Sequence, residues 1–209
     1  MMRPLAVGVV LAGLLLSPVP ARAQSPGVRA YFTYGTVSLT SSDTFKAVAD
    51  TNRAMSLGGG IQATGLWRSL FVDVGFSRQS LDGTRVFVFE NVVYPLDIPL
   101  EASFTPMDVT AGWRFDRRQY APYVGGGLSL IGYNESSSFA RAGDDVSERG
   151  TGFLFLAGVD VPVGRFLALG GELRYRAVSG VLGDSGASAV FGEDQLGGIQ
   201  YSIRISVPF

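Results

Sequence analysis

Hydrophobic and polar side chains alternate with a period of two over most of this chain. Eight such runs can be followed after the N-terminal segment, and no convincing helical period accompanies them. Successive side chains of a β-strand point to opposite faces, so each run predicts a strand with one apolar and one polar face. The runs cover residues 28–40, 55–64, 70–79, 107–115, 122–134, 152–162, 166–178 and 201–209.

The terminal run alternates strictly and ends on an aromatic residue. Its polar face would carry Ser202, Arg204, Ser206 and Pro208. In a soluble sandwich, the apolar face of such a strand needs a second sheet to cover it, whereas in a transmembrane barrel the lipid covers it. The apolar face carries Tyr201, Ile203, Ile205, Val207 and Phe209.

The segments between the runs alternate in length. Short turns are predicted at 65–68, 116–119 and 163–165, and longer polar segments at 41–53, 80–105, 135–151 and 179–195. Barrels of the outer membrane combine brief periplasmic turns with extended outer loops. A soluble eight-stranded ligand-binding barrel instead turns its polar face outward and lacks this regular alternation. We therefore predict an all-β fold, an eight-stranded antiparallel up-and-down transmembrane β-barrel.

Three details of the pattern give further expectations. The parity of the apolar positions shifts above Pro106, which predicts a bulge or a strand start there. Segment 80–105 has an alternation of its own, which predicts a hairpin that extends above the membrane. Tyr31, Phe32 and Tyr34 place aromatic rings on both faces of the first strand, so its register stays open.

Aromatic residues gather near the ends of the predicted strands. The group near the short turns is Trp67, Trp113, Phe115, Tyr120, Tyr123, Phe166 and Phe209, and the group near the long segments is Phe76, Tyr133, Phe153 and Tyr175. Amphipathic rings prefer the headgroup level of a bilayer, so the two groups predict a periplasmic girdle and an outer rim. The alternative is the aromatic core of a soluble sandwich, in which rings have no reason to collect at turns.

The N-terminus predicts an export signal. Arg3 precedes an apolar stretch over residues 5–16, and Ala21-Arg22-Ala23 forms a small-x-small cleavage site. The apolar stretch is too short to span a bilayer as an uncleaved anchor. We expect cleavage after Ala23, which makes residues 1–23 a signal peptide and residues 24–209 one barrel domain in the outer membrane of the cell envelope.

Composition favours the membrane barrel over a soluble secreted domain. The mean hydropathy is +0.25, and only 17% of the residues are charged. The chain has no cysteine, so hydrogen bonds and burial must hold the exported fold without disulfides. The formal charge of −1 becomes −3 without the two arginines of the export signal, and no basic patch predicts a nucleic-acid partner.

The export signal, the eight amphipathic runs and the terminal aromatic residue resemble the small outer-membrane beta-barrel domain family. The strands Ala121-Pro-Tyr-Val-Gly-Gly-Gly127 and Leu156-Ala-Gly-Val-Asp-Val161 add to the resemblance, which covers roughly the whole mature chain. Members include the transmembrane domain of OmpA and the barrels of OmpX and OmpW. The resemblance implies a Gram-negative-type envelope and both termini in the periplasm. It also implies that the barrel-assembly machinery reads the terminal strand ending in Phe209, although Pro208 departs slightly from the usual signal.

The chain contains no histidine. This excludes the histidine-dependent barrel enzymes, namely omptin-like proteases, lipid A deacylases and palmitoyl transferases, because they need an imidazole for acid–base chemistry at neutral pH. Without thiol or imidazole, a zinc site is not expected either. Asp184, Glu193 and Asp194 leave a calcium site in the last loop open, against ordinary solvated acids. We predict no catalytic residue, no cofactor and no resident metal.

Charged side chains also fall on inward positions of the strands. An eight-stranded barrel is only wide enough for side chains to fill, so these charges must pair with one another or with trapped water. A structural salt-bridge network is the simpler interpretation, and a gated ion path is the alternative. Inward glycines at Gly58, Gly60, Gly158 and Gly170 are expected to leave room for the arginines. The predicted network comprises Asp73, Asp108, Arg114, Asp160, Glu172, Arg174, Arg176 and Arg204.

The sequence therefore predicts a non-enzymatic integral outer-membrane barrel with a structural or surface-interaction role and a lumen filled by charged groups. One alternative is a small channel or conduit for hydrophobic or small solutes, similar to OmpW-like proteins. Another is a soluble periplasmic ligand-binding barrel. The expected partners are outer-membrane lipid, the barrel-assembly machinery during biogenesis and a surface partner bound through the loops.

Overall fold

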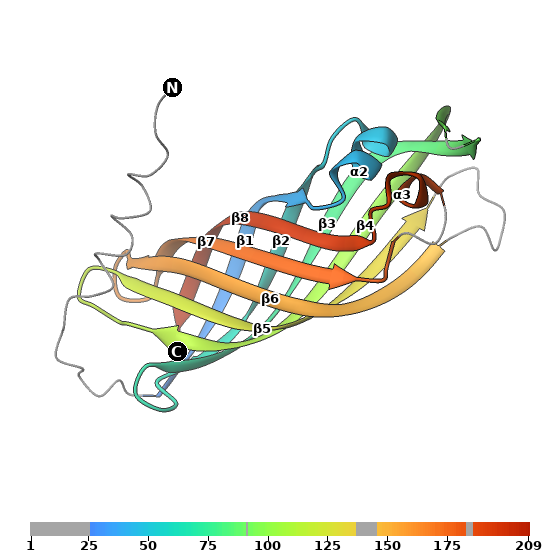
Figure 1. The fold of residues 1–209 in the computed structure, drawn as a ribbon. Coiled ribbons are helices and arrows are strands. Elements are labelled where there is room, and N and C mark those ends of the chain that lie inside the picture. Colours follow the sequence, from blue (N-terminus) through green and yellow to red (C-terminus); the bar gives the residue numbers. More distant parts are fainter. Residues whose placement is uncertain (1–25, 91, 137–145, 183–185) are drawn as a thin grey trace, which may run out of the picture.

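The described part of the chain folds into a closed β-barrel (Figure 1). The computed structural model describes residues 26–90, 92–136, 146–182 and 186–209. In these residues, eight antiparallel strands pair in chain order and β1 closes the barrel against β8, which confirms the predicted fold class. The strands are β1 (Gly27–Leu39), β2 (Arg53–Thr64), β3 (Leu70–Phe89), β4 (Val92–Arg114), β5 (Ala121–Ser136), β6 (Val146–Pro162), β7 (Ala168–Ser179) and β8 (Gln195–Pro208).

The barrel is apolar on its outer wall and polar inside. Leu57, Phe155 and Ile203 expose 52%, 61% and 63% of their surface on the outer wall. Arg174 and Arg204 occupy alternate positions of β7 and β8 and are buried inside. A soluble barrel has the reverse arrangement, so this wall is suited to contact with lipid hydrocarbon.

The two ends of the barrel differ. At the turn end, short turns join β2 to β3, β4 to β5 and β6 to β7. At the loop end the β1–β2, β5–β6 and β7–β8 connections are longer, whereas only two residues join β3 to β4. Two short helices lie at this end, α2 (Ser42–Ala49) and α3 (Gly186–Phe191) (Figure 1). The expectation of no helix is therefore wrong for these two loop segments. Neither of the described helices has the length and apolar character needed to cross a bilayer.

β3 and β4 continue past their neighbouring strands as a hairpin. β2 stops pairing with β3 at Ser80, but β3 and β4 stay paired until Phe89 lies opposite Val92. A register shift between Thr84 and Val86 interrupts this pairing. The hairpin predicted within residues 80–105 is therefore present, at the loop end of the barrel (Figure 1).

The bulge or strand start predicted at Pro106 is wrong. β4 pairs with β5 in one register from Glu101 to Arg114. Even-numbered residues of β4 stay buried on both sides of Pro106, and those above it include Ala102 and Phe104. The apolar pattern shifts because the lumen itself becomes apolar near the loop end, while the strand keeps its phase.

The structure settles the register of β1, which the sequence left open. Thr33 and Val37 are buried inside the barrel, whereas Phe32 and Tyr34 are exposed on the outer wall. Phe32 lies opposite Gly59 of β2 on one side and opposite a residue of β8 on the other. Tyr31 consequently points into the lumen, where it contacts the charged groups.

Most of the predicted aromatic girdle is exposed at the turn end, including Trp67, Trp113 and Phe166. Tyr123 and Tyr133 depart from the prediction, because both are buried inside the barrel. Both are odd-numbered residues of β5, whose odd positions face the lumen. Nearness to a strand end predicted their height along the barrel, but strand parity decides which side of the wall they occupy.

Candidate functional site

The lumen is the candidate site because it collects the charged side chains of the strands. All eight residues of the predicted network lie inside the barrel with at most 4% of their surface exposed. Four are acids and four are arginines, so their formal charges cancel. Buried charges of this kind need close partners and hydrogen bonds to offset the loss of water.

Arg114, at the end of β4, organises the charged group nearest the turn end. Its Nη1 lies 2.7 Å from Oδ2 of Asp160 on β6, and its Nε donates a hydrogen bond of 2.8 Å to Asp116. Nη1 also donates to Oε1 of Gln62 at 3.4 Å. The guanidinium carbon is 5.5 Å from the ring centre of Tyr123. This group spans the lumen from β2 to β6.

Glu172 on β7 holds the middle group together. Its Oε1 lies 2.8 Å from Nη2 of Arg174, and its Oε2 lies 2.8 Å from Nη1 of Arg204. The Tyr123 hydroxyl donates to the same Oε2 at 3.0 Å. The guanidinium of Arg204 stacks on the ring of Tyr31, with 3.7 Å from its carbon to the ring centre, so the cation gains both a carboxylate and an aromatic face.

Asp108 on β4 forms the upper group. Its Oδ2 lies 2.6 Å from Nη1 of Arg174 and 2.7 Å from Nη2 of Arg176, while its Oδ1 accepts a hydrogen bond of 2.6 Å from the Ser129 hydroxyl. Arg176 also donates to Gln200 at 2.7 Å. Because Arg174 contacts both Asp108 and Glu172, it joins the upper and middle groups into one network.

Asp73 is bound differently from the other three acids of the lumen. Its Oδ1 accepts a hydrogen bond of 2.9 Å from the Tyr31 hydroxyl. Among the described residues, no arginine forms a salt bridge with it, whereas each of the other three acids does. Tyr31 therefore has two roles, as a hydrogen-bond donor to Asp73 and as the ring under Arg204.

The sequence suggested that the inward glycines leave room for the arginines, but the structure places other groups against them. A Cβ at Gly60 would lie 2.5 Å from the Tyr31 hydroxyl, and a Cβ at Gly158 would collide with the ring of Tyr123. Gly58 and Gly170 lie against Ser77 and Asp160. At Gly60 and Gly158, the space that a side chain would fill is occupied by the two tyrosines whose rings contact Arg204.

An apolar cap covers the charged groups on the loop-end side. Phe45 of α2 meets the ring of Phe104 edge-on with centroids 5.6 Å apart, and Phe104 stacks on Tyr133 at 5.3 Å. We define the apolar cap by its buried members, Val37, Leu39, Phe45, Ala54, Leu81, Ala102, Phe104, Ile131, Tyr133, Val178, Val181 and Leu196.

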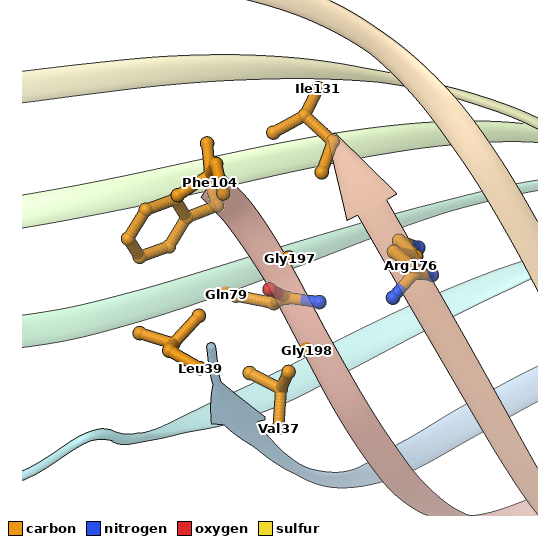
Figure 2. A pocket seen from close by; sticks show the side chains of 9 residues that line it. Val37, Leu39, Gln79, Phe104, Ile131, Arg176, Gly197 and Gly198 are labelled. Atoms are coloured by element: carbon orange, nitrogen blue, oxygen red, sulfur yellow. The ribbon is translucent and has the colours of Figure 1, made fainter. Parts of the chain in front are cut away.

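A small cavity lies between the apolar cap and the upper charged group (Figure 2). Arg176 and Gln79 line it together with apolar side chains of the cap. Its volume is about 10 Å³, room for about one water molecule. Gly198 also lines it with a φ of 139°, and a Cβ there would collide with the backbone of Ser38, so only glycine lets β8 pass this close to β1.

Glu193 ties α2 to the last loop. Its carboxylate accepts hydrogen bonds from the N–H groups of Asp43 at 3.2 Å and Thr44 at 2.8 Å, which lie in the first turn of α2 and lack helical partners. Partial burial opposes ionisation, but these hydrogen bonds and the charge of Lys46 outweigh it and lower the pKa of Glu193. The Ser41 hydroxyl adds a second tie by donating to the carbonyl of Gln195, the first residue of β8.

The calcium site that the sequence left open is not assembled by the described residues, in which no three acidic side chains group as metal ligands. Glu193 uses its carboxylate as the cap of α2. Asp184 lies outside the described residues.

The sequence matches the model of a family described as "Outer membrane protein beta-barrel domain" over residues 9–206. The chain belongs to this outer membrane barrel family. A search of the curated proteins finds no match to it.

Three solved structures share the fold of this outer membrane barrel. Neisserial surface protein A is 17% identical with a TM-score of 0.54, and the match covers 88% of this chain and 97% of that one. A major outer membrane protein from Thermus thermophilus is 11% identical with a TM-score of 0.57, covering 89% and 100%. Ail, the attachment invasion locus protein of Yersinia pestis, was solved with the heparin analogue sucrose octasulfate and is 13% identical with a TM-score of 0.50, covering 88% and 97%.

Several polar residues of this outer membrane barrel belong to the network in addition to the eight predicted from the sequence. They are Tyr31, Gln62, Tyr123, Ser129 and Gln200. Gln62 and Gln200 could have been found from their inward positions in alternating strands, but Tyr31 could not, because the register of its strand was open. The terminal strand lies with Tyr201, Ile203 and Phe209 exposed on the outer wall, and its role in assembly stays a prediction.

Proposed function

We propose that this protein is a non-conducting, non-enzymatic barrel of the outer membrane that presents its β3–β4 hairpin to a surface partner. The observation that carries the first part is the filling of the lumen by linked charged groups beneath an apolar cap. An ion passing through would have to separate arginine–carboxylate pairs with N–O distances of 2.6–2.8 Å. It would also have to cross the apolar cap without water.

The lumen acids support a structural role over a catalytic one. Asp108, Asp160 and Glu172 are each held by arginines, and Asp73 accepts a hydrogen bond from Tyr31. A catalytic nucleophile needs a neighbouring base of suitable pKa and access to a substrate. These groups are buried, and the chain has no histidine to act as such a base.

Planar-bilayer recording of the refolded protein tests the filled lumen. We expect the current to stay at the level of the protein-free bilayer, with a porin as the positive control for insertion. The heat-modifiable migration of the same sample on gels checks that it is folded. Reproducible single-channel steps from folded protein would contradict the proposal.

The hairpin tip, residues 86–89 and 92–95, carries the proposed partner surface. Phe87, Phe89, Val92 and Tyr94 are exposed, and the rings of Phe87 and Phe89 stack with centroids 6.5 Å apart. Phe87 pairs with Tyr94 and Phe89 with Val92, so the four side chains share one face. A contiguous exposed apolar face beyond the barrel wall indicates an interaction site. The fold neighbour Ail is named as an attachment protein, so a barrel of this fold can serve such a role.

Adhesion of cells that display the protein to matrix-coated plates tests the surface role. We expect displaying cells to adhere more than empty-vector cells, and a Phe87→Ser/Phe89→Ser variant to fall to the empty-vector level. Val86→Ser/Val88→Ser changes the opposite, half-buried face of the same strand and is the matched control that keeps adhesion. Equal adhesion of wild-type and empty-vector cells would argue for a purely structural role.

A conduit for small apolar solutes is the second candidate, favoured by the apolar lining of the cavity in Figure 2. At about 10 Å³, this cavity admits no solute larger than water unless the apolar cap rearranges. Proteoliposomes that enclose a fluorophore separate the candidates when the quencher added outside is a small solute that crosses protein-free lipid only slowly. Faster quenching than in protein-free liposomes would favour the conduit, and equal rates would favour the filled barrel.

A further inference from the structure

Charges outside the lumen are divided unequally between the two ends of the barrel. The four loop-end segments are 41–53, 80–105, 135–151 and 179–195. Together they hold thirteen acidic and five basic residues, a formal charge of −8. The turn-end connections instead hold four arginines and one acid, Asp116, which is bound by buried Arg114. A protein that is acidic overall therefore has a cationic end.

Four arginines lie in the turn-end connections, and Arg117 among them donates a hydrogen bond of 3.3 Å to the Tyr120 hydroxyl. They are Arg68, Arg117, Arg118 and Arg165. None of them forms a salt bridge with a carboxylate in the described part of the chain. Three are exposed and Arg117 is half-buried. Since all three short turns contribute, these cations surround the turn end instead of forming one local cluster.

Aromatic side chains set the depth of these arginines in the bilayer. The guanidinium of Arg68 lies 5.5 Å from the ring centre of Trp67, and that of Arg117 lies 5.5 Å from the ring centre of Tyr120. Phe166, the next residue after Arg165, is among the most exposed residues of the barrel. Interfacial rings sit at the headgroup level, so the neighbouring guanidinium groups lie at the level of the lipid phosphates.

We propose that the turn end is a docking surface for anionic phospholipid headgroups, to which each short turn contributes an arginine close to an aromatic residue in the sequence. The planar guanidinium matches two phosphate oxygens, and an arginine without a carboxylate partner keeps most of its donors for them. The adjacent ring packs on the upper acyl chain and glycerol region. The loop end, with a charge of −8, repels the same headgroups, so the preference belongs to one leaflet. This surface is independent of the hairpin tip and of the filled lumen.

Electron spin resonance with spin-labelled lipids tests this proposal in vesicles of phosphatidylcholine. The probe is spin-labelled phosphatidylglycerol, compared with spin-labelled phosphatidylcholine, and the readout is the fraction of each probe immobilised at the protein. We expect the wild-type protein to prefer phosphatidylglycerol by about two- to fivefold at low salt and to lose the preference in high salt, because exposed charges are screened.

Two variants with equal changes in net charge locate the site. Arg68→Gln/Arg117→Gln/Arg165→Gln should reduce the preference to near unity. The matched control, Arg53→Gln/Arg85→Gln/Arg149→Gln, removes three positive charges from the loop end and should keep or slightly raise it. A wild-type protein without headgroup preference would overturn the proposal without any variant, as would equal losses in the two variants.

Discussion

Asp108→Asn should strongly destabilise the barrel. The carboxylate accepts hydrogen bonds from Ser129 at 2.6 Å, from Arg174 at 2.6 Å and from two nitrogens of Arg176 at 2.7 and 3.2 Å. The asparagine keeps the shape but leaves the lumen with one positive charge in excess. Arg174 retains Glu172 as a partner, whereas Arg176 retains only the neutral amide of Gln200.

The cost follows from the charge left on Arg176. Removing one partner of a buried ion pair typically lowers the free energy of unfolding by about 3–5 kcal/mol, because the other charge stays buried without compensation. Replacing Arg176 as well removes that penalty. The double variant Asp108→Asn/Arg176→Gln should therefore be more stable than the sum of the single changes predicts, with a coupling energy of about 0.5–3 kcal/mol.

These free energies can be measured by equilibrium unfolding of the protein in lipid vesicles with urea. The fluorescence of Trp67 and Trp113 reports the unfolding. Asp82→Asn changes an exposed acid of the hairpin and is the control, expected within about 0.5 kcal/mol of the wild type. A loss below about 1 kcal/mol for Asp108→Asn would refute the argument. Strict additivity of the two single changes would do so as well, since it would mean that the pair is not coupled.

Three further changes test other parts of the barrel. Phe104→Ala removes a fully buried ring of the apolar cap and should cost about 3–5 kcal/mol in the same unfolding assay, and a cost near that of an exposed residue would rule out a packed cap. Glu193→Gln weakens the cap of α2 and should cost about 1 kcal/mol. Because the folded pKa of Glu193 is lowered, its stabilisation of α2 is complete above the ordinary glutamate pKa and is lost as the pH falls through the lowered value. The protection factors of the Asp43 and Thr44 amides, which correct the exchange rates for their intrinsic pH dependence, should therefore fall in acid in the wild type. An equal fall in the variant would exclude Glu193 as the cause. Deletion of Phe209 should reduce the amount of folded protein in the outer membrane of expressing cells, and unchanged assembly would remove it from the assembly signal.

The sequence predicted on which side of the barrel wall a side chain lies wherever the lipid requires an apolar residue and the lumen a polar one. Leu57, Phe155 and Ile203 could be placed outside from alternation alone, because only one face of each strand meets hydrocarbon. The same rule failed above Pro106, where Phe104 is apolar but faces inward. There both faces of the strand are apolar, so the pattern no longer distinguishes lipid from the cap.

The sequence predicted which charged residues face the lumen, but it did not predict which of them contact one another. Parity could place Asp108 and Arg176 inside, but their contact depends on the stagger between β4 and β7, which are not adjacent strands. Short helices such as α2 were missed because eight residues give too few turns for a helical period to stand out. Its anchoring by Glu193 joins positions far apart in the sequence, which no local pattern encodes.

The order of the layers inside the barrel has a consequence for leakage. The apolar cap and the salt-bridged groups beneath it are two successive barriers to permeation. Water or an ion that crosses one barrier still meets the other. The apolar cap also limits the access of water to the salt-bridged groups, and poorly hydrated ion pairs attract each other more strongly. Such a barrel should conduct ions only when substitutions disrupt both layers. A substitution that disrupts one layer should lower the stability of the protein but leave the membrane impermeable.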